Sequence, residues 1–212
     1  MGFIMNRFVD VVGTRDELRS ILNEPSELVT RKSLRRLDGH CGAFIQRSPF
    51  IMLASANAAG DLDISPKGDP IGFVKILDDQ TLAIPDRPGN NRADSMENIL
   101  QNPNVGLIFM IPGKTETLRV SGTAQIVRDE LLCESMAVKG RNPKLVIVVS
   151  VLEAFFHCSK CIIRSKLWEP GSWPILEGLP RLARTMVDAG NLELTEQQMH
   201  EIVVNDEKER LY

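Results

Sequence analysis

Between residues 63 and 98, turn-forming residues break the chain into short hydrophobic runs, and this limits the possible folds more than any other feature. Residues 63–70 read Asp-Ile-Ser-Pro-Lys-Gly-Asp-Pro, and residues 84–92 read Ile-Pro-Asp-Arg-Pro-Gly-Asn-Asn-Arg. Pro, Gly and Asn favour turns, so we interpret both stretches as cation-bearing loops beside short strands. Such a pattern is typical of sheets built from short, turn-connected strands.

The pattern becomes helical after the second loop, where Met96, Ile99 and Leu100 recur at helical spacing. A helix is therefore predicted over residues 91–101, ending before an Asn-Pro dipeptide. A loop that delivers cations to a helix start can bind an anion, because free backbone N–H groups and the helix dipole face the same point. The residues of this predicted anion site are Arg87, Asn90, Asn91 and Arg92.

The alternative is a surface turn in which these arginines pair with Asp86 and Asp94, since charged loop residues are usually solvated.

Hydrophobic periodicity predicts the other elements. Strands are expected at residues 50–56, 62–65, 71–77, 81–84, 105–111, 117–128, 145–151 and 154–165. Helices are expected from the capping box of Thr14 and Glu17, over residues 26–37 and 130–139, after Pro170, and from the capping box of Thr195 and Gln198. A loop is expected around His40 and Cys41. The many short strands predict a mainly β fold with flanking helices, arranged as an antiparallel barrel. Neither β-α-β alternation nor G-x-G-x-x-G supports a Rossmann fold.

Composition limits the partners. The 212 residues carry a net charge of −3, so no global basic field favours nucleic acid. Arg31, Lys32, Arg35 and Arg36 are a basic cluster, but without interleaved aromatic residues we expect a solvated helix face. No apolar run approaches the ~20 residues that span a bilayer, and the first residues do not resemble a signal peptide. We expect a cytoplasmic protein without nucleic-acid or membrane partners.

Two of the four cysteines, Cys158 and Cys161, form a C-x-x-C pair beside His157. This spacing is found in zinc sites and in redox-active dithiols. The strand predicted here would place the two thiols on opposite faces, and no second C-x-x-C completes a four-ligand zinc site. We therefore expect buried, reduced cysteines, including Cys41 and Cys133, and no metal.

The usual catalytic signatures are missing, including G-x-S-x-G, the Walker loop and H-E-x-x-H. Three scattered histidines form no evident triad, and the roles of His40 and His157 stay open.

The order of these elements resembles a known family. Ser-Pro-Lys-Gly-Asp, Pro-Asp-Arg-Pro-Gly-Asn-Asn-Arg and Leu-Arg-Val-Ser-Gly-Thr-Ala, with the strands around them, look like the pyridoxamine 5'-phosphate oxidase-like FMN-binding split barrels. Residues 84–92, and residues 157–168 with their His-Cys-Ser-Lys-Cys start, look like a narrower branch of FMN-dependent flavoproteins. The resemblance covers about residues 50–171.

The resemblance implies a homodimer of six-stranded split barrels with FMN at the interface. Together with the helices predicted at both ends, it leads us to expect an N-terminal helical segment (1–42), a barrel (43–171) and a C-terminal helical extension packed on the barrel (172–212). The flavin would supply the redox chemistry, so the protein needs no conspicuous nucleophile.

The resemblance also implies the cofactor-binding residues. Those before and along the third strand would line the flavin ring: Ser65, Lys67, Gly68, Asp69 and Val74. Those of the second loop and helix start would bind the phosphate: Arg87, Asn90, Asn91, Arg92 and Ser95. Lys160 and Arg164 are expected on one side of a strand and are also assigned to the cofactor site. Trp168, just beyond them, would cover a ligand edge; the alternative is that this tryptophan packs at an interface or in the core.

The sequence departs from true pyridoxamine 5'-phosphate oxidases at two places. Its phosphate loop is longer, and the substrate-binding C-terminal tail of those enzymes has no counterpart in a chain that ends in two helices. We therefore expect an FMN-dependent oxidoreductase acting on another small molecule. The alternative is a non-catalytic module that binds FMN or a phospho-ligand.

Overall fold

The computed structural model describes residues 8–212, and its first helix is fixed by capping residues. The chain forms two compact units, one up to Ser33 and one from Leu34 to Tyr212. In the first unit, α1 (Arg15–Ile21) begins with the predicted capping box, because Thr14 Oγ1 accepts the Glu17 N–H while the Glu17 carboxylate accepts the Thr14 N–H. Neither α1 nor α2 (Glu27–Thr30) buries a residue.

The predicted helix over residues 26–37 is wrong beyond Thr30. Leu34 instead forms a two-way backbone bridge with Ala154, in which each N–H donates to the other carbonyl. The loop expected around His40 and Cys41 is also wrong, because α3 (Gly39–Ile45) forms there. Its N-cap is Asp38, whose carboxylate accepts the Cys41 N–H at 2.8 Å.

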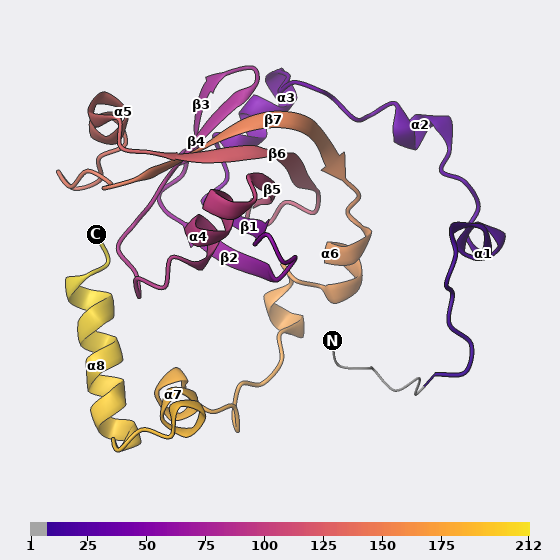
Figure 1. The fold of residues 1–212 in the computed structure, drawn as a ribbon. Helices are drawn as coiled ribbons and strands as arrows, with labels where there is room; N and C mark the ends of the chain where they lie inside the picture. Colours follow the sequence, from indigo (N-terminus) through magenta and orange to yellow (C-terminus); the bar gives the residue numbers. More distant parts are fainter. Residues whose placement is uncertain (1–7) are drawn as a thin grey trace. The chain divides into compact units, whose positions relative to one another are not determined.

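The second unit is built on one antiparallel sheet of seven strands in the order β2-β1-β5-β6-β7-β4-β3 (Figure 1). The strands are β1 (Phe50–Ala56), β2 (Leu62–Gly68), β3 (Lys75–Asp78), β4 (Thr81–Pro85), β5 (Asn104–Met110), β6 (Thr117–Val127) and β7 (Val146–His157). The predicted mainly β, antiparallel class is confirmed. The sheet has seven strands rather than six and is open at the edges β2 and β3.

Several predicted boundaries differ from the structure. Residues 66–68, expected in a loop, continue β2, because Pro66 is tolerated on an edge strand that has one free side. β3 begins only at Lys75. The two strands expected between residues 145 and 165 are one strand, β7, followed by α6 (Lys160–Ser165).

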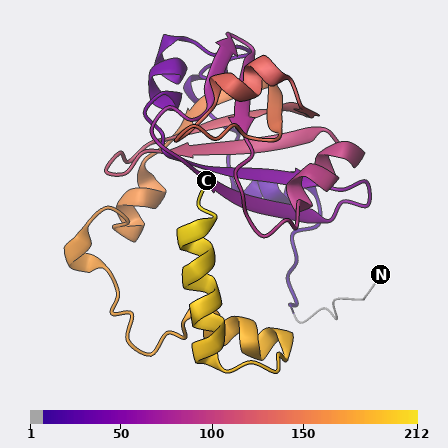
Figure 2. The ribbon, with the colours of Figure 1, turned by 90° about the vertical axis from the view of Figure 1, so that its left-hand side faces the viewer.

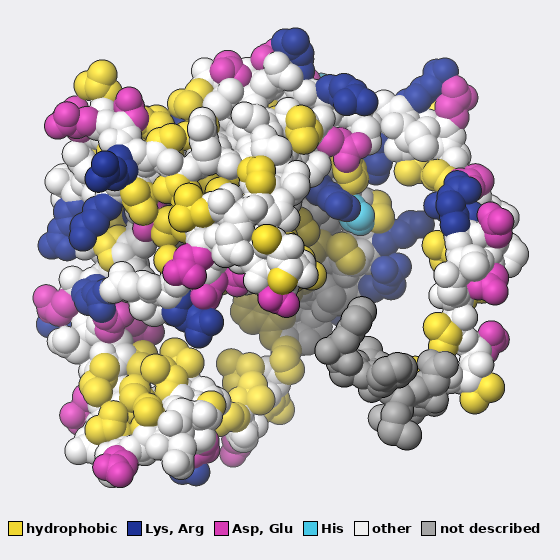
Figure 3. Space-filling model, viewed as in Figure 1, with side chains coloured by type: hydrophobic (Ala, Val, Ile, Leu, Met, Phe, Trp, Pro, Cys, Tyr) yellow, Lys and Arg dark blue, Asp and Glu magenta, His cyan; other side chains and the backbone are white. Residues whose placement is uncertain are grey.

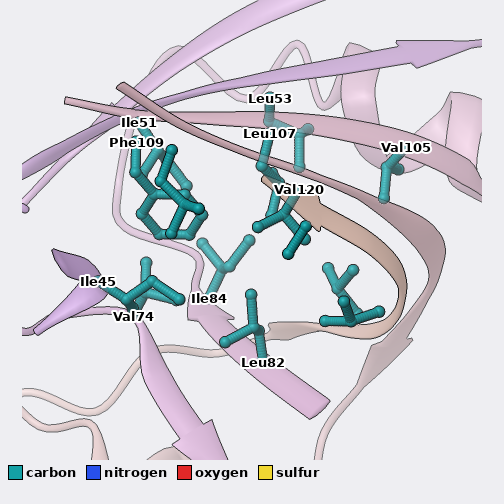
Figure 4. Close-up of a cluster of buried hydrophobic side chains, with 14 of the residues drawn as sticks. Ile45, Ile51, Leu53, Val74, Leu82, Ile84, Val105, Leu107, Phe109 and Val120 are labelled. Atoms are coloured by element: carbon teal, nitrogen blue, oxygen red, sulfur yellow. The ribbon is translucent and has the colours of Figure 1, made fainter. Parts of the chain in front are cut away.

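The core lies on the inner face of the sheet (Figure 4). Ile51 and Leu53 of β1 pair in register with Phe109 and Leu107 of β5, and all four side chains are buried. Each such side chain contributes about 2 kcal/mol by leaving water. Val74, which we expected at the flavin ring, is one of these core residues.

A bulge separates the two halves of the central strands. The register between β6 and β7 shifts at Gly122, and a Cβ there would lie 2.1 Å from the Ser150 carbonyl oxygen. Only glycine allows this close approach of two backbones.

The remaining helices flank the sheet. They are α4 (Asp94–Gln101), α5 (Glu130–Ser135), η1 (Pro170–Ser172), α7 (Leu182–Gly190) and α8 (Glu196–Glu209). α8 begins with the predicted capping box of Thr195 and Gln198 and runs from α7 towards the sheet (Figures 1 and 2). Ala183 and Met199 are buried, whereas hydrophobic side chains gather at the surface over α7 and α8 (Figure 3).

None of the helices within residues 8–212 is both long enough and apolar enough to cross a membrane.

Candidate functional site

A cavity of about 1120 Å³ lies at the β2 edge of the sheet. Two walls enclose it. The first, which we call the loop wall, consists of β2, the connection from β4 to α4 and the start of α4. The second, the C-terminal wall, consists of residues 141–145 together with Glu209, Arg210 and Tyr212 at the end of α8.

Strand β2 contributes alternate polar side chains to the loop wall. Lys67 and Ser65 pair in register with Ile51 and Leu53, which face the core. Side chains of cross-strand pairs lie on the same face, so Lys67 and Ser65 also face inwards, at the open edge where the cavity begins. No described carboxylate forms an ion pair with Lys67.

The connection to α4 has an unusual backbone. Asn91 and Ala93 have positive φ angles of 59° and 58°. The left-handed conformation is tolerated by asparagine and is unfavourable for alanine. Ala93 is the N-cap of α4 and provides no side-chain hydrogen bond to the helix start. The first-turn N–H groups of α4 therefore remain available at the cavity.

Ser95 joins α4 to β2. Its hydroxyl donates to Asp63 Oδ2 at 2.6 Å, and the residue is buried. This hydrogen bond fixes the helix start against the edge strand. It also uses the single O–H donor of Ser95, which is then not available to a ligand. Asp63 thereby places a carboxylate in the same wall as the expected anion site.

Arg87 is held by protein groups rather than left free. Its Nε donates to Asp69 Oδ2 at 2.5 Å and its Nη2 donates to the Met136 carbonyl at 2.9 Å. The Asp69 side chain is 1% exposed and the Arg87 side chain 15%. Because exchanging this partner would leave a buried carboxylate unpaired, Arg87 is first a structural residue that also lines the cavity.

Arg92 is differently placed. Its Nε donates to Asp94 Oδ2 at 2.6 Å, but the two side chains are 72% and 42% exposed. The hydrogen bond and charge of Asp94 raise the pKa of Arg92. Exposed pairs of this kind are worth about 0–1 kcal/mol, so Arg92 can exchange Asp94 for a ligand anion at little cost.

Asp86 adds a second carboxylate to the loop wall. Burial raises its pKa, and the nearby charges of Lys67 and Arg87 oppose that shift. The pocket thus destabilises the ionised form of this side chain.

The C-terminal wall was missed by sequence reasoning, which expected the last helices only to pack outside the barrel. Arg210 Nη2 donates to the Gly89 carbonyl at 2.8 Å, and the Tyr212 hydroxyl donates to Asp69 Oδ1 at 3.0 Å. The residues in each of these contacts are more than 120 positions apart in the sequence, so no local sequence pattern predicts the contacts.

The structure brings most of the predicted site residues together. The cavity is lined by Ser65, Lys67, Gly68, Arg87, Asn90, Asn91, Arg92 and Ser95. Asp69 lies behind Arg87, and Val74 lies in the core. Lys160, Arg164 and Trp168 do not line the cavity of their own chain.

The prediction that Lys160 and Arg164 lie on a strand is wrong, because both lie on α6. The Trp168 Nε1 donates to the Lys114 carbonyl at 2.8 Å.

The cysteines divide into two pairs. Cys41 and Cys133 are buried, as expected, whereas Cys158 and Cys161 are exposed and free, so the prediction that they are buried is wrong. The strand expected over residues 154–165 ends at His157 and is followed by α6, so these two cysteines do not lie in the sheet. Among residues 8–212, no three His, Cys, Asp or Glu side chains form a group suited to a metal ion.

Solved structures of several other proteins are similar to this chain. HupZ of Group A Streptococcus is 21% identical, with 57% of this chain and 93% of HupZ covered and a TM-score of 0.46. General Stress Protein 26 of Bacillus anthracis is 15% identical, with coverages of 54% and 88% and a TM-score of 0.42. An FMN-binding protein of Syntrophomonas wolfei is 9% identical, with coverages of 55% and 80% and a TM-score of 0.42.

No curated protein sequence matches the chain. The sequence model of the pyridoxamine 5'-phosphate oxidase family, however, matches residues 37–158, which include every strand of the sheet. Because this match covers more than half of the residues of the chain, the chain belongs to the pyridoxamine 5'-phosphate oxidase family.

Proposed function

We propose that this protein binds FMN in the cavity and uses it as an oxidoreductase acting on a small molecule. One observation carries the proposal: a single cavity combines Lys67, which forms no ion pair with any described carboxylate, and uncapped helix N–H groups at the loop wall with an apolar lining. This combination suits a ligand with a phosphate at one end and a flat, largely apolar ring at the other.

The phosphate would be held by the loop wall. Lys67 offers a cation without an ion-pair partner among the described residues, and Arg92 can exchange its exposed contact with Asp94. The free N–H groups at the start of α4 add backbone donors of the kind that bind phosphate. Asn90 and Asn91 line the same loop and provide side-chain amide donors.

The ring would lie against apolar side chains. Phe73, Pro85, Met96 and Leu145 line the cavity from four different segments. A bound flavin supplies the electron-transfer chemistry, so this chain has only to bind it, orient it and exclude water. Phosphate anchoring and an apolar wall perform these three tasks, which explains why no histidine or cysteine is needed in the lining.

The protein would act as a homodimer. The outer face of the sheet, opposite the core, is unusually apolar for a surface. Its exposed side chains from β1, β2 and β5 include Phe50, Leu62, Ile64 and Ile108. A second copy of the chain can bury the same patch on both subunits by two-fold symmetry. Any contact of Lys160, Arg164 or Trp168 with a flavin would have to come from that second subunit.

The dimer is tested by sedimentation velocity at micromolar concentration. Ile64→Lys should shift the wild-type dimer to a folded monomer, while Leu131→Lys, a matched change of an exposed residue on α5, should not. A wild-type protein that sediments as a monomer would contradict the proposal.

Cofactor binding is tested by the absorbance spectrum of the purified protein and by titration of cofactor-free protein with FMN. A flavin spectrum and stoichiometric FMN binding are expected, and a protein that binds no flavin would overturn the proposal. Oxidation of a nicotinamide cofactor with an artificial acceptor then separates an enzyme from a non-catalytic FMN-binding module.

A further inference from the structure

The C-x-x-C pair lies at the surface, in a part of the second unit that the cavity does not use. Strand β7 ends at His157, Cys158 follows it, and Cys161 is the second residue of α6 (Figure 1). Both thiols are free and exposed, and no residue of α6 lines the cavity. We expected two inert thiols on opposite faces of a strand, and the exposed pair at a turn brings back the redox chemistry of this spacing.

The backbone brings the two cysteines within bridging distance. Ser159, the N-cap of α6, has φ −70° and ψ −11°, and Lys160 is already helical. Two consecutive residues in this conformation form a single turn, whose ends have Cα atoms less than about 7 Å apart. A disulfide joins residues whose Cα atoms are about 4.4–6.8 Å apart. A Cys158–Cys161 disulfide can therefore form without unwinding α6.

Positive charge accompanies the pair. Residues 154–168 include Lys160, Arg164 and Lys166 and not one Asp or Glu. All three cations are exposed, and within residues 8–212 none of them forms an ion pair with a carboxylate. Their charge is therefore available to a molecule that approaches α6 from solvent.

The helix places two of these cations beside one thiol. Cys161 lies three positions before Arg164, and Lys160 lies four positions before it, so the three side chains are neighbours on the helix surface. Ile162 is buried and lies two positions from each cation, which turns the side of α6 that bears Lys160 and Arg164 away from the core.

We propose that Cys158 and Cys161 form a dithiol site that is oxidised by a small, negatively charged disulfide. The cations attract the carboxylates of that molecule and hold it beside Cys161. This inference does not depend on the proposed FMN binding, because the pair lies outside the cavity.

The oxidation consists of two thiol–disulfide exchanges. The Cys161 thiolate attacks one sulfur of the small disulfide, whose S–S bond breaks and releases one small thiolate. The Cys158 thiol then loses its proton to solvent, and its thiolate attacks the Cys161 sulfur of the mixed disulfide, which releases the second small thiolate. The two protein thiols are thus oxidised, and the small disulfide is reduced to two small thiols that take up the two protons.

The first test identifies the product. The protein is reduced, freed of reductant and incubated without oxygen with glutathione disulfide, which is anionic. Trypsin cleaves after Lys160, so the peptides that end at Lys160 and begin at Cys161 stay joined only when the disulfide has formed, as mass spectrometry should show. Cys158→Ser should instead accumulate glutathione on Cys161. Wild-type protein that keeps both thiols reduced, or that carries glutathione on both, would overturn the proposal.

The second test isolates the role of the cations. The rate of disulfide formation is measured with glutathione disulfide and with cystamine, a cationic disulfide. Arg164→Gln should slow the reaction with glutathione disulfide by about twofold or more, should not slow the reaction with cystamine, and should lose its effect at high salt. Equal slowing with both reagents would assign the effect to the thiols themselves and overturn recognition of an anionic disulfide.

Arg128→Gln is the matched control for Arg164→Gln. Arg128 is exposed and directly follows Val127, which pairs with Val146 at the start of β7, whereas α6 follows the end of that strand. A strand of 12 residues spans roughly 40 Å, about four Debye lengths at moderate salt. This variant should react as the wild type does with both disulfides, and slowing equal to that of Arg164→Gln would show that the local cations are not the cause.

Discussion

Arg87 and Asp69 form an ion pair that joins three segments of the fold. The carboxylate accepts the Arg87 Nε–H at one oxygen and the Tyr212 hydroxyl at the other. Replacing Arg87 by methionine keeps the apolar stem but leaves a carboxylate that is 1% exposed without its charge partner. We expect Arg87→Met to lower the free energy of unfolding by about 3–5 kcal/mol, measured by urea denaturation.

Two controls assign this loss to the unpaired charge. The double variant Arg87→Met/Asp69→Leu should recover much of the stability, because both charges are removed together. Arg36→Met breaks the exposed pair with Asp79, whose side chains are 64% and 52% exposed, and should change stability by at most about 1 kcal/mol. A similar small change for Arg87→Met would contradict the structural role.

The close approach at Gly122 predicts a steric limit at the bulge between β6 and β7. A methyl group there would meet the Ser150 carbonyl oxygen at 2.1 Å, so strand β7 must move to admit it. We expect Gly122→Ala to lower the free energy of unfolding by at least about 2 kcal/mol. Gly106→Ala is the matched control on β5, because its nearest neighbour would be the Ala54 Cβ at 3.9 Å. Equal stabilities of the two variants in thermal denaturation would show that the bulge is not rigid.

Sequence reasoning succeeded where a local signal agrees with burial. The capping boxes at Thr14 and Thr195 start helices as predicted, because two side chains at fixed spacing satisfy backbone donors without help from the rest of the fold. Strands β1 and β6 were also predicted, since their alternation matches a sheet with one buried face.

The failures occur where tertiary contacts outweigh local preference. Pro66 suggested a loop, but an edge position allows it within β2. Ile162 and Ile163 favoured a strand, yet α6 forms and buries Ile162. In the candidate site, the loop-wall residues carry local turn and helix-start signals and were identified. Tyr212 was not, because only the folded chain brings it to Asp69.

The raised pKa of Asp86 predicts how the stability of the protein depends on pH. Burial raises its pKa above the unfolded value, so the folded state binds this proton more tightly than the unfolded chain. The contribution of the Asp86 carboxyl to the free energy of unfolding is therefore largest below the pKa that this group has in the unfolded chain. That contribution is lost as the pH rises through the pKa that the group has in the folded state. Asp86→Asn should raise the urea midpoint at pH 7, and this gain should vanish below about pH 3.9.

Glu134→Gln, which alters an exposed carboxylate on the adjacent α5, serves as the control and should leave the midpoint unchanged at both pH values. A lower midpoint for Asp86→Asn at pH 7 would mean that attraction by Lys67 and Arg87 outweighs burial.

The cysteines should react in two classes. Burial raises the pKa of the Cys41 thiol to about 11, and Cys133 is buried as well, whereas Cys158 and Cys161 are exposed. Thiolates are the reactive form, so we expect two thiols per chain to react rapidly with a chromogenic disulfide reagent at pH 8 and two only after denaturation. In the variant Cys158→Ser/Cys161→Ser the rapid phase should disappear; its persistence would place a reactive thiol elsewhere.

The last prediction concerns Arg92, which lines the loop wall but is held only by the exposed contact with Asp94. If it exchanges that contact for the FMN phosphate, it gains charge-assisted hydrogen bonds worth about 1.5–3 kcal/mol. Arg92→Ala should then weaken FMN binding by roughly tenfold or more, leave riboflavin binding unchanged and preserve the urea midpoint.

Arg31→Ala is the matched control for Arg92→Ala, because Arg31 also forms an exposed ion pair, with Glu27 at 2.5 Å, and lies outside the cavity lining. It should change neither affinity. Riboflavin, which lacks the phosphate, separates loss of the phosphate contact from a distorted ring site, since a distorted site would weaken both ligands. Equal FMN affinity in Arg92→Ala and the wild type would assign the phosphate to Lys67 and the α4 backbone alone.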